Sequence, residues 1–128
     1  MQLRRLDPVA LKLTALGFDR DGAEQLSRAG TLLDLEAGTP LCREGDLGME
    51  AFVLVAGQAS VLLDAAVVTL SAGDVFGELA TLDRSRRRNA TVVAASDVTV
   101  LVFDARSYAR LAGTTELHLR LAPVGRAA

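Results

Sequence analysis

The chain has no tryptophan, one cysteine, one histidine and only 4% aromatic residues. The single cysteine, Cys42, excludes an internal disulfide and a zinc site built from several cysteines, and we expect its side chain to be buried. The single histidine, His118, is too little for a metalloenzyme centre in which several histidines surround one ion. Neither a Ser-His-Asp pattern nor a catalytic pair of carboxylates is evident, so we expect no enzymatic activity.

Strong charge of either sign is also missing. Fourteen basic and sixteen acidic residues give a formal net charge of −2, whereas a general nucleic-acid binder is normally basic. The N-terminal residues show no signal-peptide pattern, and no apolar stretch is long enough to span a membrane, so we expect neither a leader nor a membrane span. We therefore expect a cytoplasmic protein that inserts into no membrane and binds no nucleic acid.

Half of the 128 residues are hydrophobic, and between Thr31 and Phe103 they form short aliphatic and β-branched segments. Gly, Asp and Pro separate these segments, a pattern typical of a mainly β sandwich or jelly-roll barrel. The glycines between them are predicted to occupy turns with positive φ: Gly38, Gly45, Gly48, Gly57 and Gly73. The predicted strands are Leu32–Leu35, Pro40–Cys42, Ala51–Val55, Ser60–Leu63, Val67–Leu70, Thr91–Ala95 and Val98–Phe103.

Helices are predicted on both sides of this β region. Asp7-Pro8 is a typical helix start, and Gly17 is expected to end that first helix. A second helix is predicted to begin near Asp21, with Glu24 completing a capping box, and to end at Gly30.

After the strands, Asp104 is expected to cap a third helix over 105–112, and a last short helix is predicted over 114–122. We therefore predict a single domain, 1–128. Its parts are N-terminal helices (1–30), a β-roll (31–103), C-terminal helices (104–122) and a tail (123–128).

The segment from Phe76 to Val92 combines features that suit a sugar phosphate. A short helix opening at Gly77 leaves backbone N–H groups unpaired, and such groups attract an anion. Arg88 supplies a planar set of donors that fits phosphate oxygens, and Glu78 supplies an acceptor for a hydroxyl. Small residues, Gly77 and Ala80, allow a ligand to approach the backbone closely.

Three ordered motifs carry a family resemblance that spans about 31–110. Residues 76–82 read FGELATL, and residues 88–92 read RNATV; together they resemble the phosphate-binding cassette of the cyclic nucleotide-binding domain family. The EGD of residues 44–46 with the FVLVAG of residues 52–57, and the LSAGDVF of residues 70–76, resemble two further signatures of that family. The resemblance implies a jelly-roll-like β-roll with a short phosphate-cassette helix.

The resemblance also implies the ligand and its contacts. Arg88 is expected to bind the cyclic phosphate, and Glu78 the ribose 2′-hydroxyl. Asn89 is able to contact either phosphate or base, which leaves cAMP or cGMP open with a preference for cAMP. The ligand-binding residues that it implies are Phe76, Gly77, Glu78, Leu79, Ala80, Arg88, Asn89 and Ala90.

In the family, a C-terminal helix closes over the base. Here 114–122 is too short for such a lid, so we expect a regulatory module whose protein effector lies on another chain. The main alternative is a degenerate domain that keeps the fold as a protein-interaction scaffold. In that case Arg88 is one more charge on a solvated arginine-rich loop, and Glu78 is an acid favoured at a helix N-terminus. A jelly-roll metalloenzyme is a third, weaker alternative.

Overall fold

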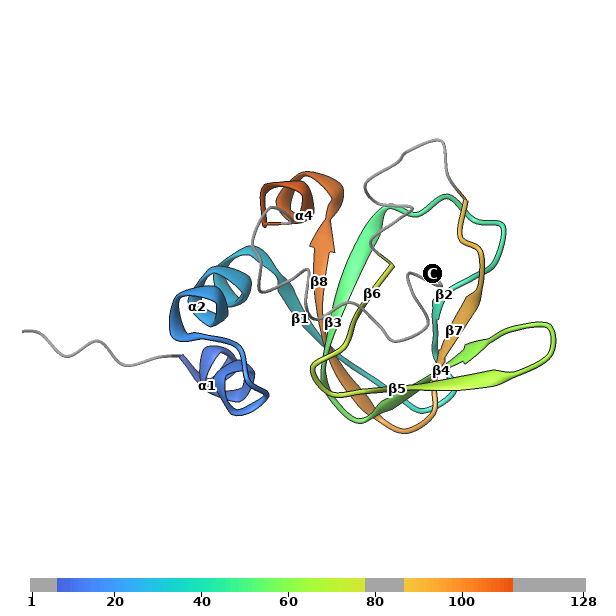
Figure 1. Cartoon of the computed structure of the whole chain (residues 1–128), viewed down its shortest axis with the longest axis horizontal. Helices are drawn as coiled ribbons and strands as arrows, with labels where there is room; N and C mark the ends of the chain where they lie inside the picture. The colour runs from blue at the N-terminus through green and yellow to red at the C-terminus, as the bar shows by residue number, and fades with distance from the viewer. Residues whose placement is uncertain (1–6, 78–86, 112–128) are drawn as a thin grey trace, which may run out of the picture.

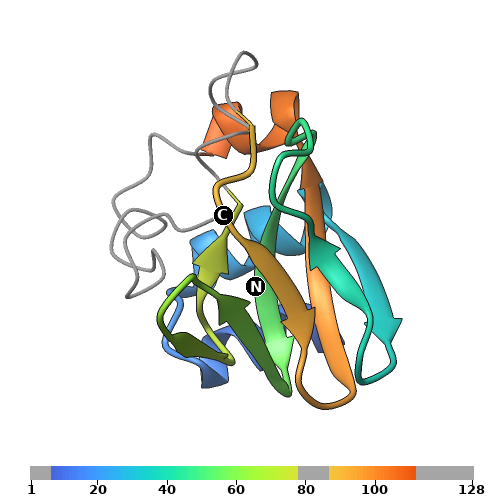
Figure 2. The ribbon, with the colours of Figure 1, turned by 90° about the vertical axis from the view of Figure 1, so that its right-hand side faces the viewer.

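Two four-stranded antiparallel sheets face each other and form a β-roll (Figures 1 and 2). The computed structural model describes residues 7–77 and 87–111. One sheet has the strand order β1-β8-β3-β6 and the other has the order β2-β7-β4-β5. The strands are β1 (Thr31–Leu35), β2 (Pro40–Cys42), β3 (Glu50–Ala56), β4 (Gln58–Leu62), β5 (Val67–Ser71), β6 (Val75–Phe76), β7 (Thr91–Ala94) and β8 (Val98–Asp104).

The sequence predicts all of these strands except β6, with ends that differ by at most two residues. The two residues of β6 are too few to show a strand period. They form a strand because they pair with β3, with Phe52 opposite Phe76 and Val53 opposite Val75. The predicted mainly β, jelly-roll-like fold is confirmed.

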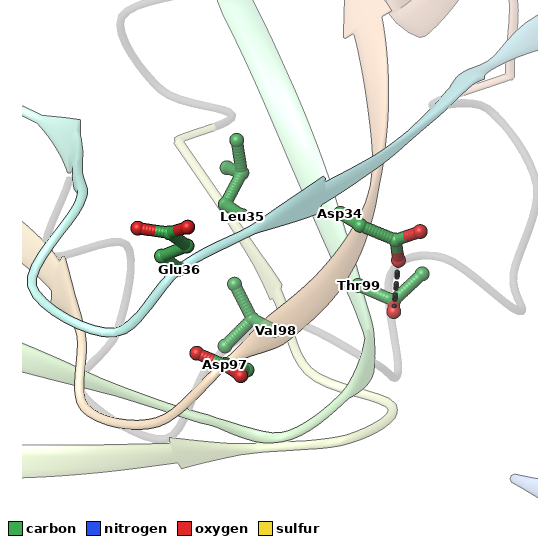
Figure 3. A pocket seen from close by; sticks show the side chains of 6 residues that line it. All are labelled: Asp34, Leu35, Glu36, Asp97, Val98 and Thr99. Carbon is green, nitrogen blue, oxygen red and sulfur yellow. Dashed lines mark hydrogen bonds between the residues drawn. The ribbon is translucent and has the colours of Figure 1, made fainter.

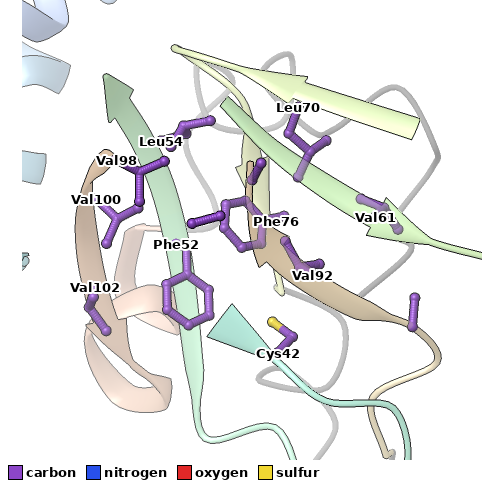
Figure 4. Packing of buried hydrophobic residues seen from close by; sticks show 13 residues of the cluster. Cys42, Phe52, Leu54, Val61, Leu70, Phe76, Val92, Val98, Val100 and Val102 are labelled. Atoms are coloured by element: carbon purple, nitrogen blue, oxygen red, sulfur yellow. The ribbon is translucent and has the colours of Figure 1, made fainter. Parts of the chain in front are cut away.

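Strands β3 and β8 are buried on both faces, and their side chains alternate between two hydrophobic clusters. The cluster between the two sheets is called the inner core here, and Figure 4 shows its packing. It is built from Cys42, Phe52, Leu54, Ala59, Val61, Leu70, Phe76, Ala90, Val92, Ala94, Val98, Val100 and Val102. As predicted, the side chain of Cys42 is buried.

The second cluster, called the outer core here, lies on the other face of the sheet that contains β3 and β8. It joins residues such as Val53, Leu101 and Phe103 of that sheet to three helices. These helices are α1 (Pro8–Ala15), α2 (Arg20–Ala29) and α4 (Ala105–Leu111), and they gather on one side of the molecule (Figure 1).

Aspartates begin all three helices. The predicted caps are confirmed for α1, where Asp7 accepts a hydrogen bond from the Ala10 N–H (2.8 Å), and for α4, where Asp104 accepts one from the Ser107 N–H (2.7 Å). Helix α2 begins at Arg20, within one residue of the predicted start, but the predicted cap is wrong by two residues. Its cap is Asp19, which accepts a bond from the Gly22 N–H (2.6 Å), so Asp21 lies inside the first turn.

One turn prediction is also wrong. Gly48 does not have a positive φ, whereas the other four glycines predicted between strands do. Gly48 is buried and lies next to an isolated bridge between Leu47 and Arg87. Gly57 is constrained both by its backbone and by its surroundings: its φ is +86°, and a Cβ there would lie 2.3 Å from the Asp97 carbonyl oxygen.

Two predicted elements lie outside the described residues: the cassette helix after Gly77 and the helix over 114–122, with His118. The end of the third helix beyond Leu111 lies outside them as well. None of the helices in the described part has both the length and the apolar character that a membrane crossing requires.

Candidate functional site

Arg88 is a buried residue, with only 6% of its surface exposed. It lies just before β7, in a segment that pairs with the turn after β2. The Arg88 N–H donates to the Asp46 carbonyl (2.7 Å), and the Gly45 N–H donates to the Arg88 carbonyl (2.9 Å). The EGD motif at residues 44–46 therefore has a physical role, because its backbone fixes the backbone of this arginine.

The guanidinium of Arg88 brings two further segments together. Its Nη1 donates to the carbonyl oxygen of Gly77 (2.7 Å), at the end of β6. Its Nη2 donates to the carbonyl oxygen of Glu50 (2.6 Å), at the start of β3. Both acceptors are neutral carbonyl oxygens, so the contribution of these two bonds is to fix the position of the guanidinium.

Gly77 lies against the Arg88 guanidinium, at a position that has no room for a side chain. Its φ is +82°, a conformation that side chains disfavour. A Cβ at this position would lie 2.8 Å from Nη1 of Arg88 and 3.2 Å from both the Glu50 carbonyl oxygen and Cδ2 of Phe52. Glycine is therefore required both by the backbone and by the approach of the arginine.

The other predicted ligand-binding residues have different positions. Phe76 and Ala90 have 2% and 1% of their surface exposed, and both side chains lie in the inner core. Asn89 is exposed beside Arg88. Glu78, Leu79 and Ala80 lie outside the described residues. The structure thus brings Gly77, Arg88 and Asn89 together, and it places Phe76 and Ala90 in the layer beneath them.

Two parts of this arrangement were not predicted from the sequence. The Phe52 ring lies under the guanidinium, with Cζ of Arg88 5.9 Å from the ring centroid. The carbonyl of Glu50 accepts a hydrogen bond, although the Glu50 side chain has no part in it. Phe52 begins the FVLVAG motif, so its position carried a signal, but a backbone carbonyl leaves none in the sequence.

A hollow of about 330 Å³ lies elsewhere, at the turn that joins β1 to β2 (Figure 3). It is lined by Asp34, Leu35, Glu36, Asp97, Val98 and Thr99. Asp34 accepts a hydrogen bond from the Thr99 hydroxyl (2.6 Å), and Asp97 accepts one from the Ala37 N–H (3.0 Å). Three carboxylates would repel a phosphate, so this hollow is unsuited to a nucleotide.

A second hollow, of about 350 Å³, lies between α2 and α4 and is lined by Gln25, Arg28, Ala29, Arg110 and Leu111. It shares no residue with the surroundings of Arg88. In the part of the chain that the structure describes, no group of three or more Asp, Glu, His or Cys side chains could hold a metal ion.

Comparison with known proteins agrees with the motifs. The family model of the cyclic nucleotide-binding domain matches residues 32–115. The cAMP-dependent protein kinase regulatory subunit of Schizosaccharomyces pombe is 34% identical over 98 residues, which are 75% of this chain and 24% of that protein. A cyclic nucleotide-gated potassium channel of Rhizobium etli is 40% identical over 65 residues, 51% of this chain and 18% of the channel.

Among solved structures, PKAR CBD2 bound to Sp-2Cl-cAMPS superimposes with a TM-score of 0.70 and 29% identity, covering 83% of this chain and 73% of that one. The chain spans about a quarter or less of the length of the two curated relatives named above. The family resemblance predicted from the motifs is confirmed by sequence and by fold. The chain belongs to the cyclic nucleotide-binding domain family, whose domains are regulatory ligand-binding modules.

Proposed function

We propose that this domain binds cAMP at Arg88 and transmits the binding to a protein effector on another chain. The observation that carries the proposal is the buried guanidinium of Arg88, held between the carbonyl oxygens of Gly77 and Glu50. An arginine keeps its charge in proteins, and a cation of low exposure interacts strongly with an anion placed beside it. The cyclic phosphate supplies that anion.

Gly77 supports the same site, because the lack of a side chain there brings the backbone close to the guanidinium. We propose that backbone N–H groups of 77–80 and the guanidinium share the phosphate oxygens. Glu78 then accepts a hydrogen bond from the ribose 2′-hydroxyl, and Asn89, exposed beside Arg88, faces the nucleotide. Phe76 and Ala90 act through their packing and their backbone rather than through direct side-chain contacts.

The preference for cAMP over cGMP rests on the relatives. The similar Schizosaccharomyces pombe protein is the regulatory subunit of a cAMP-dependent protein kinase, and the superimposed PKAR CBD2 carries Sp-2Cl-cAMPS. For transmission, α1, α2 and α4 pack on the outer face of the sheet whose inner face holds Phe52 beside Arg88. A single-domain organisation, a cytoplasmic location and the lack of enzymatic activity stay predictions.

Isothermal titration calorimetry with cAMP and with cGMP tests the proposal. We expect cAMP to bind with a dissociation constant of about 1 μM or lower, and more tightly than cGMP. Arg88→Ala should weaken binding about 100-fold, because it removes charge-assisted hydrogen bonds to the phosphate. Arg88→Lys keeps the charge but loses the planar arrangement of donors, so its affinity for cAMP should lie between those of the wild type and Arg88→Ala.

Arg28→Ala is the matched control. Arg28 is an exposed arginine on α2, and its loss should leave affinity unchanged. Circular dichroism melting of each variant separates lost binding from lost folding. A folded wild-type sample that binds neither nucleotide would contradict the proposal and favour a protein-interaction scaffold.

A further inference from the structure

We infer that Phe52 is a positioning residue that sets the orientation of the Arg88 guanidinium for the ligand. The inference rests on the proposed function. Phe52 lies on β3, two residues after Glu50, with 5% of its surface exposed. Cζ of Arg88 lies over its ring at 5.9 Å from the centroid, within the range in which a guanidinium is attracted to an aromatic face.

The ring of Phe52 is itself held in place. It pairs across the sheet with Phe76 and stacks against that ring, with the centroids 4.9 Å apart and the planes 13° from parallel. Two stacked rings at the edge of a packed core have little freedom to tilt. The guanidinium therefore lies over a fixed aromatic surface rather than over a mobile side chain.

The ring supplies a constraint that the two hydrogen bonds lack. The carbonyl oxygens of Gly77 and Glu50 fix the positions of Nη1 and Nη2 of Arg88. These two contacts lie at the edge of the guanidinium, whereas Phe52 lies against its face. The aromatic face restricts the tilt of the guanidinium plane, and with it the direction in which the Nη groups point.

Gly77 ties these groups into one packed unit. A Cβ on Gly77 would lie 3.2 Å from Cδ2 of Phe52 and 2.8 Å from Nη1 of Arg88, so there is no spare volume between the ring, the glycine and the guanidinium. A smaller side chain at position 52 would open space on this side. The guanidinium would then sample orientations that fit a phosphate less well.

The test compares Phe52→Leu with Phe103→Leu. Phe103 is a buried phenylalanine of the same sheet, on its outer face, so its replacement costs similar packing without approaching Arg88. In folded samples, we expect Phe52→Leu to weaken cAMP binding about tenfold, and Phe103→Leu to keep the affinity within about twofold of the wild-type value. Phe52→Tyr, which keeps the aromatic face, should restore most of the affinity.

A second measurement needs no ligand. Rotation of the Arg88 guanidinium is followed by NMR of its Nη groups, with the signals assigned from their loss in Arg88→Lys. Phe52→Leu should speed this rotation, whereas Phe103→Leu and Phe52→Tyr should not. Unchanged rotation and unchanged affinity in Phe52→Leu would overturn the inference. If the wild type binds no nucleotide, the proposed function fails, and the rotation rates still decide whether Phe52 positions Arg88.

Discussion

The two faces of the sheet that contains β3 and β8 differ in what they support. The inner face packs against the second sheet, and at one end its Phe52 lies beneath Arg88. The outer face carries α1, α2 and α4 and has no described contact with that arginine. Neighbouring residues of β3, Phe52 and Val53, therefore belong to a candidate binding site and to a helix-packing surface, respectively.

Strand β3 alone thus separates the candidate site from the helices. Phe52 and Leu54 point inward, while Ala51, Val53 and Val55 point outward. A rearrangement around Arg88 can reach the helices by shifting β3 as a unit, because packed side chains transmit strain. Substitutions on each face can therefore show whether the two faces respond together or separately.

The largest effect is expected from cavities on the two faces. Leu54→Ala on the inner face and Leu13→Ala on the outer face each remove a fully buried side chain, and each should lower the free energy of unfolding by about 3 kcal/mol. Because β3 and β8 contribute to both cores, each variant should still unfold in one transition. Urea denaturation followed by circular dichroism checks this, and a separate early transition in Leu13→Ala would show that the helices unfold independently.

A smaller effect is expected from glycines with positive φ. Gly38→Ala adds a Cβ that meets nothing within 4 Å, so only backbone strain of about 1 kcal/mol should appear. Gly77→Ala adds the same strain and also displaces Arg88, for a total loss of about 2 kcal/mol. Only Gly77→Ala should weaken cAMP binding, by at least about tenfold. Equal affinity in the two variants would show that Gly77 does not control the inner-face site.

The smallest change in the free energy of unfolding is expected on acidification, and it arises at the capping aspartates of the helices that pack on the outer face. The Ala10 N–H, and then the Ser27 hydroxyl, hold the pKa of Asp7 below its ordinary value of 3.8. A carboxyl whose pKa is lowered on folding stabilises the fold above its unfolded pKa, and that stability is lost as the pH falls through the folded pKa.

The free energy of unfolding should therefore decrease as the pH falls below about 4, with a shallower slope in Asp7→Asn. The hydrogen bond from the Ser107 N–H lowers the pKa of Asp104 in the same direction, so Asp104→Asn should flatten the slope further. Neither substitution touches the inner core. An unaltered slope in the double variant would assign the acid sensitivity to other groups.

The sequence predicts the strands well where turns bound them, and less well where tertiary pairing creates them. Residues 51–55 form a continuous apolar segment because β3 is buried on both faces, and the segment was recognised as a strand. The two residues of β6 become a strand only through their pairing with β3. At α2 the capping-box pattern of Asp21 with Glu24 predicts the wrong cap, because the structure uses Asp19, two residues earlier.

For the candidate site, the motifs assign Gly77 and Arg88 to one predicted ligand site, and the structure joins these two residues by a hydrogen bond. The motifs could not show what holds the guanidinium, because the carbonyls of Gly77 and Glu50 belong to the backbone and have no residue-specific signature. The support from Phe52 depends on the register between β3 and β6, which only the fold reveals. The roles of Glu78, Leu79 and Ala80 stay predictions.

The anchoring of Arg88 has a thermodynamic consequence. Its backbone is bonded to the turn at residues 44–46, and its side chain is bonded to two carbonyls. A free arginine side chain carries about 2 kcal/mol of rotamer entropy that is lost when it becomes ordered. Here that entropy is lost when the chain folds, before any nucleotide arrives. If Arg88 binds the phosphate as proposed, the ligand does not incur that cost, which favours high affinity from a small number of contacts.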